Sequence, residues 1–260
     1  MEWEAAFIRR WILERARVGA WIWMGLGLLG LAAAEMLYDG WQLPLLLFWV
    51  WVIGYMDVIS ILTIKELRHQ MARLDQTCDP APLLAWCRSV LRQNPGSTRY
   101  RVYEGFCLLL LGREVEALST LEQVEGRRKL WRQPDSFLLY VACRSDLSDP
   151  GTAGQWLEQG RRAARRKWLG RKTLEKALKE QELCLALRQG QTEGLEGAMK
   201  ACLEKASSLR LRVAWHYELG QLFRALGRPE EAAEHLRFVA QYGNRLAIRS
   251  RAEELLEPGR

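Results

Sequence analysis

Two apolar runs fill the first quarter of the chain, and a very short turn separates them. The first run, 18–38, contains one charged residue, Glu35, and the second, 41–64, contains one, Asp57. Each run has about the ~20 residues that a helix needs to cross the hydrocarbon layer of a bilayer. Because the connection is so short, the pattern predicts two antiparallel transmembrane helices that form a hairpin.

Basic residues flank this hairpin at its outer ends and are absent from its turn. Arginines precede the first run, and Lys65, Arg68 and Arg73 follow the second. Loops rich in Lys and Arg stay on the cytoplasmic side, so both termini are predicted to be cytoplasmic. The alternative is a secretory signal peptide cleaved near Ala32–Ala34, which would still leave the C-terminal part inside because the second run remains.

Residues 1–17 place aromatic and aliphatic side chains at helical spacing, with arginines between them. Two interpretations of this leader stay open. It is either an amphipathic helix that lies on the inner leaflet or an extension of the first transmembrane helix.

Two features inside the hairpin suggest chemistry. The first is Asp57, because an ionisable residue within a membrane span is a candidate for a functional role. The alternative is a span that ends near Ser60, with Asp57 at the inner interface. The glycines of 25–30 have G-x-G-x-x-G spacing, but a dinucleotide site needs a strand before that motif. They indicate close helix packing instead, through a face of small residues, Gly27, Gly30 and Ala34.

Beyond residue 64 the apolar positions recur with helical periodicity, and strand patterns are nearly absent. The chain is therefore predicted to be all-α, with 65–78 as a juxtamembrane linker and 79–260 as a domain of antiparallel helix pairs. Pro, Gly and Asn separate the segments. The predicted helices include 100–111, 113–124, 172–188, 191–205, 209–226, 229–242 and 245–256, and others open near 79, 134 and 149.

Two of these helix pairs share an internal pattern. Gly105, Gly112 and Ala117 have the same spacing as Gly220, Gly227 and Ala232, and each block contains a Leu-Gly-Arg turn. The pattern resembles the tetratricopeptide repeat, a helix–turn–helix unit of 34 residues. It covers about 79–125 and 209–244. Residues 126–208 lack it and are expected to form pairs of altered length or of another kind.

The resemblance implies an α-solenoid whose inner helices line a concave groove for partner peptides. Tyr217, Gln221 and Arg224 are the predicted partner-binding residues, with a solvated helix face as the alternative. The equivalent positions of the first block are apolar and are expected to be covered by a neighbouring helix. The family's groove positions fall on Ala214, Tyr217, Gln221, Arg224 and Ala225 in the last block and on Arg99, Val102, Phe106, Leu109 and Leu110 in the first.

Charge and cysteine content separate the two parts further. Residues 65–260 contain 34 of the 38 Lys and Arg and 25 of the 31 Asp and Glu, whereas seven of the twelve Trp lie in the first 51 residues. All six Cys lie in the basic part without C-x-x-C spacing, and the three His are isolated. We expect reduced cysteines in the core, and no metal or cofactor site.

One basic cluster stands out between two predicted helices. It is a candidate contact for anionic lipid headgroups, for an acidic partner or for RNA. The alternative is a solvated face. Its members are Arg161, Arg162, Arg165, Arg166 and Lys167.

No nucleotide-binding loop, nucleophile elbow or zinc-protease motif occurs in the sequence, so the protein is not expected to be an enzyme. The leading hypothesis is a membrane-anchored cytoplasmic scaffold that binds an unidentified protein partner through its TPR-like repeats. A second hypothesis is an accessory subunit of a membrane enzyme or transporter that works through the hairpin and Asp57. Nucleic-acid binding through the basic cluster is the least favoured.

Overall fold

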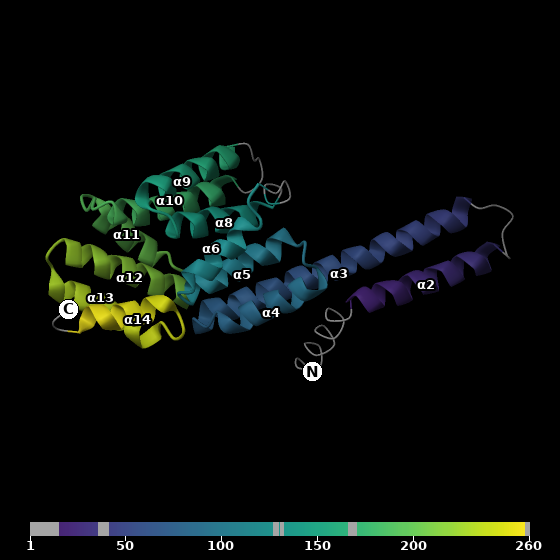
Figure 1. Cartoon of the computed structure of the whole chain (residues 1–260), viewed down its shortest axis with the longest axis horizontal. Coiled ribbons are helices and arrows are strands. Elements are labelled where there is room, and N and C mark those ends of the chain that lie inside the picture. Colours follow the sequence, from purple (N-terminus) through teal and green to yellow (C-terminus); the bar gives the residue numbers. More distant parts are fainter. Residues whose placement is uncertain (1–15, 36–41, 127–129, 131–132, 166–170, 258–260) are drawn as a thin grey trace. The chain divides into compact units, whose positions relative to one another are not determined.

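The computed structural model describes residues 16–35, 42–126, 130, 133–165 and 171–257. Every regular element in these ranges is an α-helix, and they contain no strand (Figure 1). The predicted all-α fold class is therefore confirmed. The chain divides into two compact units, Met1–Gln70 with Arg92–Pro95 and Met71–Leu91 with Gly96–Arg260.

The first unit contains α2 (Ala16–Glu35) and α3 (Gln42–Thr77) as far as Gln70. Helix α3 continues beyond the predicted run, so the segment expected to be a linker is helical as far as Thr77. No helix of the described residues combines the length and the apolar character that crossing a membrane requires. The expected transmembrane hairpin therefore finds no support there. The leader as far as residue 15, and the side chain of Asp57, lie outside the described residues.

Tryptophans join the two helices of this unit. The rings of Trp23 and Trp51 stack with centroids 4.0 Å apart. Each indole N–H donates to the other residue's carbonyl at 3.2 Å. A Cβ on Gly27 would lie 3.1 Å from Trp51 and 3.2 Å from Phe48, so the predicted close approach occurs there. Gly30 takes no part in this close approach, because a Cβ added there would meet nothing within 4 Å.

The second unit is a succession of helices with short connections, and their bounds lie close to the predicted ones. Helix α11 differs most, since it begins four residues later than predicted, after Gly194 at φ 73°. The helices are α4 (Ala81–Gln93), α5 (Thr98–Leu110), α6 (Glu114–Glu122), α8 (Pro134–Asp146), α9 (Pro150–Arg165), α10 (Arg171–Arg188), α11 (Leu195–Glu204), α12 (Leu209–Ala225), α13 (Pro229–Tyr242) and α14 (Ala247–Leu256).

Side-chain caps explain where several of these helices begin. Asp149 Oδ1 accepts hydrogen bonds from the N–H groups of Gly151 and Thr152 at 3.0 and 3.1 Å. The Thr152 side chain, together with these N–H groups, lowers the pKa of the Asp149 carboxyl. The Ser208 hydroxyl accepts from the Leu211 N–H at 3.3 Å. In both places a short polar side chain satisfies an N–H that has no partner within the helix.

The two repeat-like blocks have the same packing between their helices. A Cβ on Gly105 would lie 2.9 Å from Leu121, and one on Gly220 would lie 2.8 Å from Leu236. The alanines named with them, Ala117 and Ala232, are fully buried. The small residues therefore allow α5 to approach α6, and α12 to approach α13, as the sequence pattern predicts.

The turns of the two blocks are also equivalent. Gly112 and Gly227 adopt φ of 74° and 70°, as predicted for the turn glycine. After α5, the Arg113 N–H donates to the Leu108 carbonyl at 2.9 Å, and after α12 the Arg228 N–H donates to the Phe223 carbonyl at 2.8 Å. This pattern satisfies carbonyls that a helix end leaves without a partner.

The region between the blocks also consists of packed helix pairs, although it lacks the repeat pattern. Helix α8 packs on α9, α9 on α10, and α11 on α12. A Cβ on Gly160 would lie 2.8 Å from Leu178 and 3.2 Å from Val141, so Gly160 is the close-contact residue of this region. Helix pairs therefore continue through the region between the blocks, although the repeat spacing is absent there.

Helices from the two ends of the second unit meet. Helix α14 packs on α5 as well as on α12 and α13. The Arg251 guanidinium of α14 forms an ion pair with Glu114 at the start of α6. A Cβ added to Gly112, in the turn after α5, would lie 3.0 Å from the methyl carbon of Ala247 in α14. These contacts close the succession of helices into a ring.

The end of α3 reinforces this closure. The Asp75 carboxylate accepts a hydrogen bond from Arg210 Nε at 2.7 Å. Nearby, the Asn244 side-chain amide donates to the Thr77 carbonyl at 2.7 Å. These contacts join the start of the second unit to α12 and to the connection before α14.

Candidate functional site

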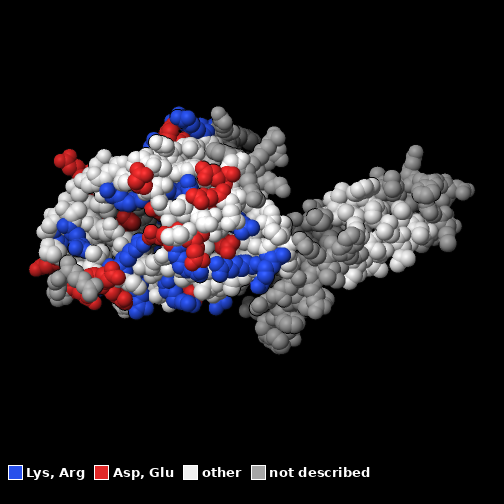
Figure 2. All heavy atoms as spheres, viewed as in Figure 1, with Lys and Arg blue, Asp and Glu red and all other residues white. Residues whose placement is uncertain are grey.

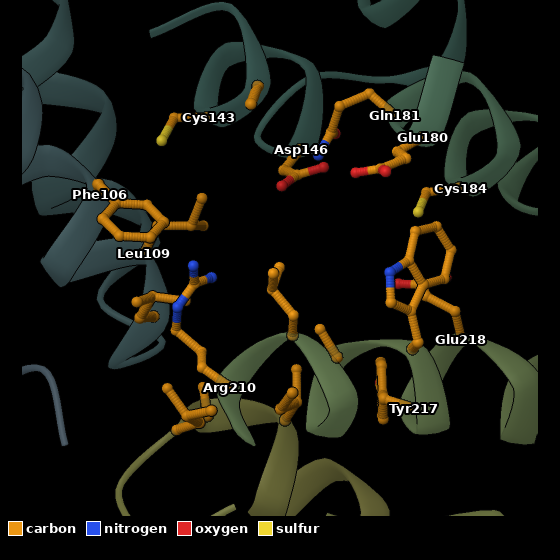
Figure 3. A pocket seen from close by; sticks show the side chains of 18 of the residues that line it. Phe106, Leu109, Cys143, Asp146, Glu180, Gln181, Cys184, Arg210, Tyr217 and Glu218 are labelled. Carbon is orange, nitrogen blue, oxygen red and sulfur yellow. The ribbon is translucent and has the colours of Figure 1, made fainter. Parts of the chain in front are cut away.

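A cavity of about 600 Å³ lies inside the ring of helices (Figure 3). Side chains from α5, α8, α10, α12 and α14 line most of it. Six of the predicted groove positions are among them, three from each repeat-like block: Phe106, Leu109, Leu110, Ala214, Tyr217 and Gln221.

The structure places two of the three predicted partner-binding residues in the cavity and one outside it. Tyr217 and Gln221 line the cavity, whereas Arg224 is exposed and does not. Tyr217 is buried, and burial raises the pKa of its phenol. The apolar positions of the first block were expected to be covered by a neighbouring helix, and the structure covers them only in part. Phe106 is buried, but it still faces the cavity with the half-buried Leu109.

Besides Glu114, three acidic side chains reach this cavity from three different helices. Asp146 at the end of α8 and Glu180 of α10 point toward the same space, and Glu218 extends from α12 (Figure 3). The pKa of Glu218 is raised to about 7, mainly by burial and also by the charge of Asp146, although Arg188 lowers it. Burial likewise raises the pKa of Asp146 to about 6. Its side chain keeps 43% of its surface accessible because it faces the open cavity.

Each arginine of the cavity already has an acidic partner. Arg188 Nη2 lies 3.6 Å from Asp146 Oδ1, and Arg188 also donates to the Ser145 carbonyl. Arg210 pairs with Asp75, which does not line the cavity. Arg251 pairs with Glu114 at the rim of the ring. The positive charges are thereby neutralised.

Two polar groups of the cavity lack such partners. Among the described residues, no ion pair or hydrogen bond of the Glu218 carboxylate is found. The Gln181 Oε1 atom is buried and has no hydrogen-bond partner there. Both groups accept hydrogen bonds at neutral pH. The cavity therefore has unsatisfied acceptors and a surplus of acidic groups.

Sequence reasoning did not find the acidic residues of this site. Asp146, Glu180 and Glu218 belong to helices that are distant in sequence, and two of them lie outside the repeat-like blocks. For Glu218 a local signal exists, since it lies between the buried Tyr217 and Leu219. A charged residue inside an inward-facing apolar stretch marks a site more often than a surface.

The basic cluster is partly neutralised where it is described. Arg161 lies 2.6 Å from Glu182 and 3.7 Å from Glu158, which also accepts from Arg162. Arg165 is exposed. Arg166 and Lys167 lie outside the described residues.

Two histidines that looked isolated in the sequence are in contact. His216 Nδ1 and His235 Nδ1 lie 2.8 Å apart, between α12 and α13. His216 stacks on Phe238, and His235 stacks on Phe223. Burial and the neighbouring His235 lower the pKa of His216 to about 4. In the described part of the chain, no group of three potential metal ligands forms around this pair or elsewhere.

Four of the six cysteines are buried, as expected for core residues, and Cys184 and Cys202 are half-buried. Burial raises the pKa of the Cys107 thiol to about 12. It also raises the pKa of Cys184, which lines the cavity, well above its ordinary range. These thiols are poor nucleophiles because little thiolate forms.

Comparison of the chain with protein-family models, with curated proteins and with solved structures gave no match. The argument for function therefore rests on the cavity and on the surfaces of the helices.

Proposed function

We propose that this protein is a helical-repeat scaffold that binds a segment of a partner protein in the cavity of its second unit. One observation supports this most. The predicted groove positions of the first and the last repeat-like pair lie in two parts of the sequence, yet they line one cavity. Tyr217, Gln221 and Phe106 supply apolar and hydrogen-bonding surface of the kind that ligand pockets use.

The repeat type is part of this proposal. The equivalent glycine contacts and turns of α5–α6 and α12–α13 support a TPR-like unit, in which inner helices present their side chains to a peptide. A cavity of about 600 Å³ is within the usual size range of small-ligand sites. It therefore suits a few side chains of an extended segment rather than a whole helix.

Site-specific photocrosslinking in cells tests the binding role. A photoreactive residue at Gln221, in the cavity, is expected to capture a discrete partner. The matched position is Arg237, exposed on α13. Filling the cavity with Leu109→Trp should abolish the product at 221. Equal capture at both positions, or capture that persists after Leu109→Trp, would argue against the cavity as the binding site.

We also infer that α2 and the first part of α3 attach this scaffold to a membrane, with both chain ends cytoplasmic. Large apolar side chains are exposed on both helices, among them Leu29 at 69% and Val50 at 61%. In the view of Figure 2 the described part of this surface shows no charged side chain. Contiguous exposed apolar surface marks a lipid or protein contact. Attachment does not require a spanning helix, because an apolar helix face also binds within the interface.

A high-salt wash of isolated membranes tests the attachment, because apolar contact with lipid does not depend on ionic strength. The full-length chain is expected to stay with the membrane pellet, and Leu29→Arg combined with Val50→Arg is expected to shift it to the supernatant. Val115→Arg is the matched control, because Val115 is an exposed apolar residue of the second unit. Recovery of the unaltered chain in the supernatant would refute membrane attachment and leave the scaffold proposal standing.

A further inference from the structure

We propose that the partner segment carries a lysine or arginine side chain whose cation binds in the cavity beside Glu218 and Asp146. This inference rests on the proposed scaffold function and names the chemistry that the same cavity recognises.

Charge complementarity is the first argument. The arginines of the cavity are each matched by a carboxylate, and Glu218 has no ion pair or hydrogen bond among the described residues. A second carboxylate, Asp146, faces the same space and shares only one arginine contact, at 3.6 Å. Like charges that face one partly enclosed cavity disfavour each other's ionised form unless a cation joins them. A ligand cation would supply that charge, whereas a ligand carboxylate would be repelled.

The buried amide of Gln181 gives a second, independent argument. Gln181 lines the same cavity, and its buried Oε1 atom has no hydrogen-bond partner among the described residues. A buried acceptor without a donor destabilises the protein that holds it. The ammonium of lysine and the guanidinium of arginine have only donors, so either would satisfy this atom as well as the carboxylates.

The walls of the cavity suit the rest of such a side chain. Phe106, Leu109 and Trp215 present apolar surface on the way to the acidic residues. The aliphatic stem of lysine or arginine packs on surface of this kind while its charged end reaches a polar group. Aromatic rings near the cation stabilise it further.

Binding of a cation should be linked to the protonation of Glu218. The pKa of this carboxyl is about 7 in the free protein, and a bound cation favours its ionised form. Affinity is therefore expected to rise with pH through neutrality. The titratable and charged groups that line the cavity with Glu218 are Glu114, Cys143, Asp146, Glu180, Cys184, Arg188, Arg210, Tyr217 and Arg251.

A random heptapeptide library, displayed on phage and selected against the purified full-length chain in detergent, tests the inference. We expect the bound peptides to be enriched in Lys or Arg at one position beside apolar residues. Glu218→Gln and Asp146→Asn should remove this enrichment. Glu254→Gln, an exposed acidic residue on α14, should retain it.

A selected peptide is then titrated by intrinsic tryptophan fluorescence. Binding should be about tenfold tighter at pH 8 than at pH 6, because one proton leaves a group with a pKa near 7. Glu218→Gln should lose most of this dependence and keep only the smaller part that comes from Asp146, whose pKa is about 6. Replacing the peptide lysine by norleucine should weaken binding at least tenfold, and this test needs no protein variant.

The outcomes separate the two proposals. Peptides selected without Lys or Arg enrichment, or a norleucine peptide that binds equally well, would overturn the cationic ligand while the peptide-binding function stands. Failure to select any cavity-dependent peptide would overturn both.

Discussion

Glu218 and Asp146 hold carboxyl groups in surroundings that disfavour their charge. The pKa of Glu218 is about 7, above its ordinary value of 4.5. Between these two pH values the folded protein binds more protons than the unfolded chain. The stability that this carboxyl contributes is therefore fully present below pH 4.5 and is lost as pH rises through 7.

Glu218→Gln should consequently stabilise the protein at alkaline pH. Glutamine resembles the protonated carboxyl, so the free energy of unfolding should rise by roughly 1–3 kcal/mol at pH 8 and change little at pH 4.5. Urea unfolding of the full-length chain at both pH values measures this. An equal change at the two pH values would contradict the assigned burial of this carboxyl.

The His216–His235 pair should have the opposite effect on pH dependence. The pKa of His216 is about 4 in the folded state, below its ordinary value of 6.5, so the unfolded chain binds more protons between these values. Stability should be present above pH 6.5 and fall by roughly 1–2 kcal/mol toward pH 5. It is best measured in the Glu218→Gln background, which lacks the opposing titration.

His216→Gln should reduce this acid-linked loss, because it removes the titrating ring. His69→Gln is the control, since His69 is exposed on α3. Should His69→Gln reduce the loss as much as His216→Gln does, the buried pair would not be its source.

The histidine pair and Glu218 show what sequence reading missed at this scale. The contact between His216 and His235 depends on the crossing of α12 over α13, which periodicity does not specify. The surplus charge of the cavity depends on which arginine pairs with which carboxylate. Tyr217 and Gln221 were identified because the resemblance to the tetratricopeptide repeat implies which positions of its first helix face the groove.

At the scale of helices, glycine contacts set how closely pairs approach. Gly220→Ala should destabilise the protein by about 1–3 kcal/mol, because the added methyl would lie 2.8 Å from Leu236 in a fully packed core. Gly154→Ala in α9 meets no atom within 4 Å. It should instead stabilise by about 0.5–1 kcal/mol through helix propensity. Thermal unfolding of the two variants distinguishes packing from propensity; equal effects would contradict the close approach.

The turn glycines permit a finer comparison. Alanine at Gly112 or Gly227 must adopt the left-handed conformation, at a cost of about 1–2 kcal/mol. Gly112→Ala should lose more stability than Gly227→Ala, because only its methyl would meet Ala247 of α14. Chemical denaturation of both variants side by side checks this order. Equal losses of stability would mean that α14 shifts to accommodate the added methyl group without any loss of packing energy.

Helix positions were largely predictable because apolar periodicity, Pro and Gly act locally. The packing of α9 against α8 and α10 was less predictable, since Gly160 makes the close contact there without the expected spacing. The continuation of α3 to Thr77 was missed because the change in composition at residue 65 was interpreted as an element boundary. A polar stretch can continue an apolar helix, so a change in composition is not a helix end.

At the scale of the second unit, closure depends on contacts between residues far apart in sequence. The Asp75–Arg210 pair is half-buried at 2.7 Å and joins the end of α3 to α12. A double-mutant cycle with alanine at both positions should give a coupling energy of about 1 kcal/mol or more. The Arg249–Glu253 pair, exposed on one helix, should give about 0.3–0.5 kcal/mol.

Hydrogen exchange gives an independent readout of closure. Arg210→Ala should speed exchange of the amides in 71–80 and in α14, whereas Arg162→Ala, which removes an exposed ion pair within α9, should not. Unchanged exchange at 71–80 would show that the asparagine and backbone contacts suffice to hold the ring. Such closure could not be predicted from the sequence, because it joins residues 135 positions apart.

The contact of α14 with α5 also limits how this architecture can change. An open stack of repeats can gain or lose a helix pair at its free end, because each pair contacts only its neighbours. Here α14 packs on α5 of the first repeat-like pair, so a copy inserted between these two helices would have to separate them. Duplication of one helix pair would separate α14 from α5 and open the cavity instead of lengthening the molecule. The number of helix pairs is therefore fixed by the circumference, as the number of blades is in a propeller.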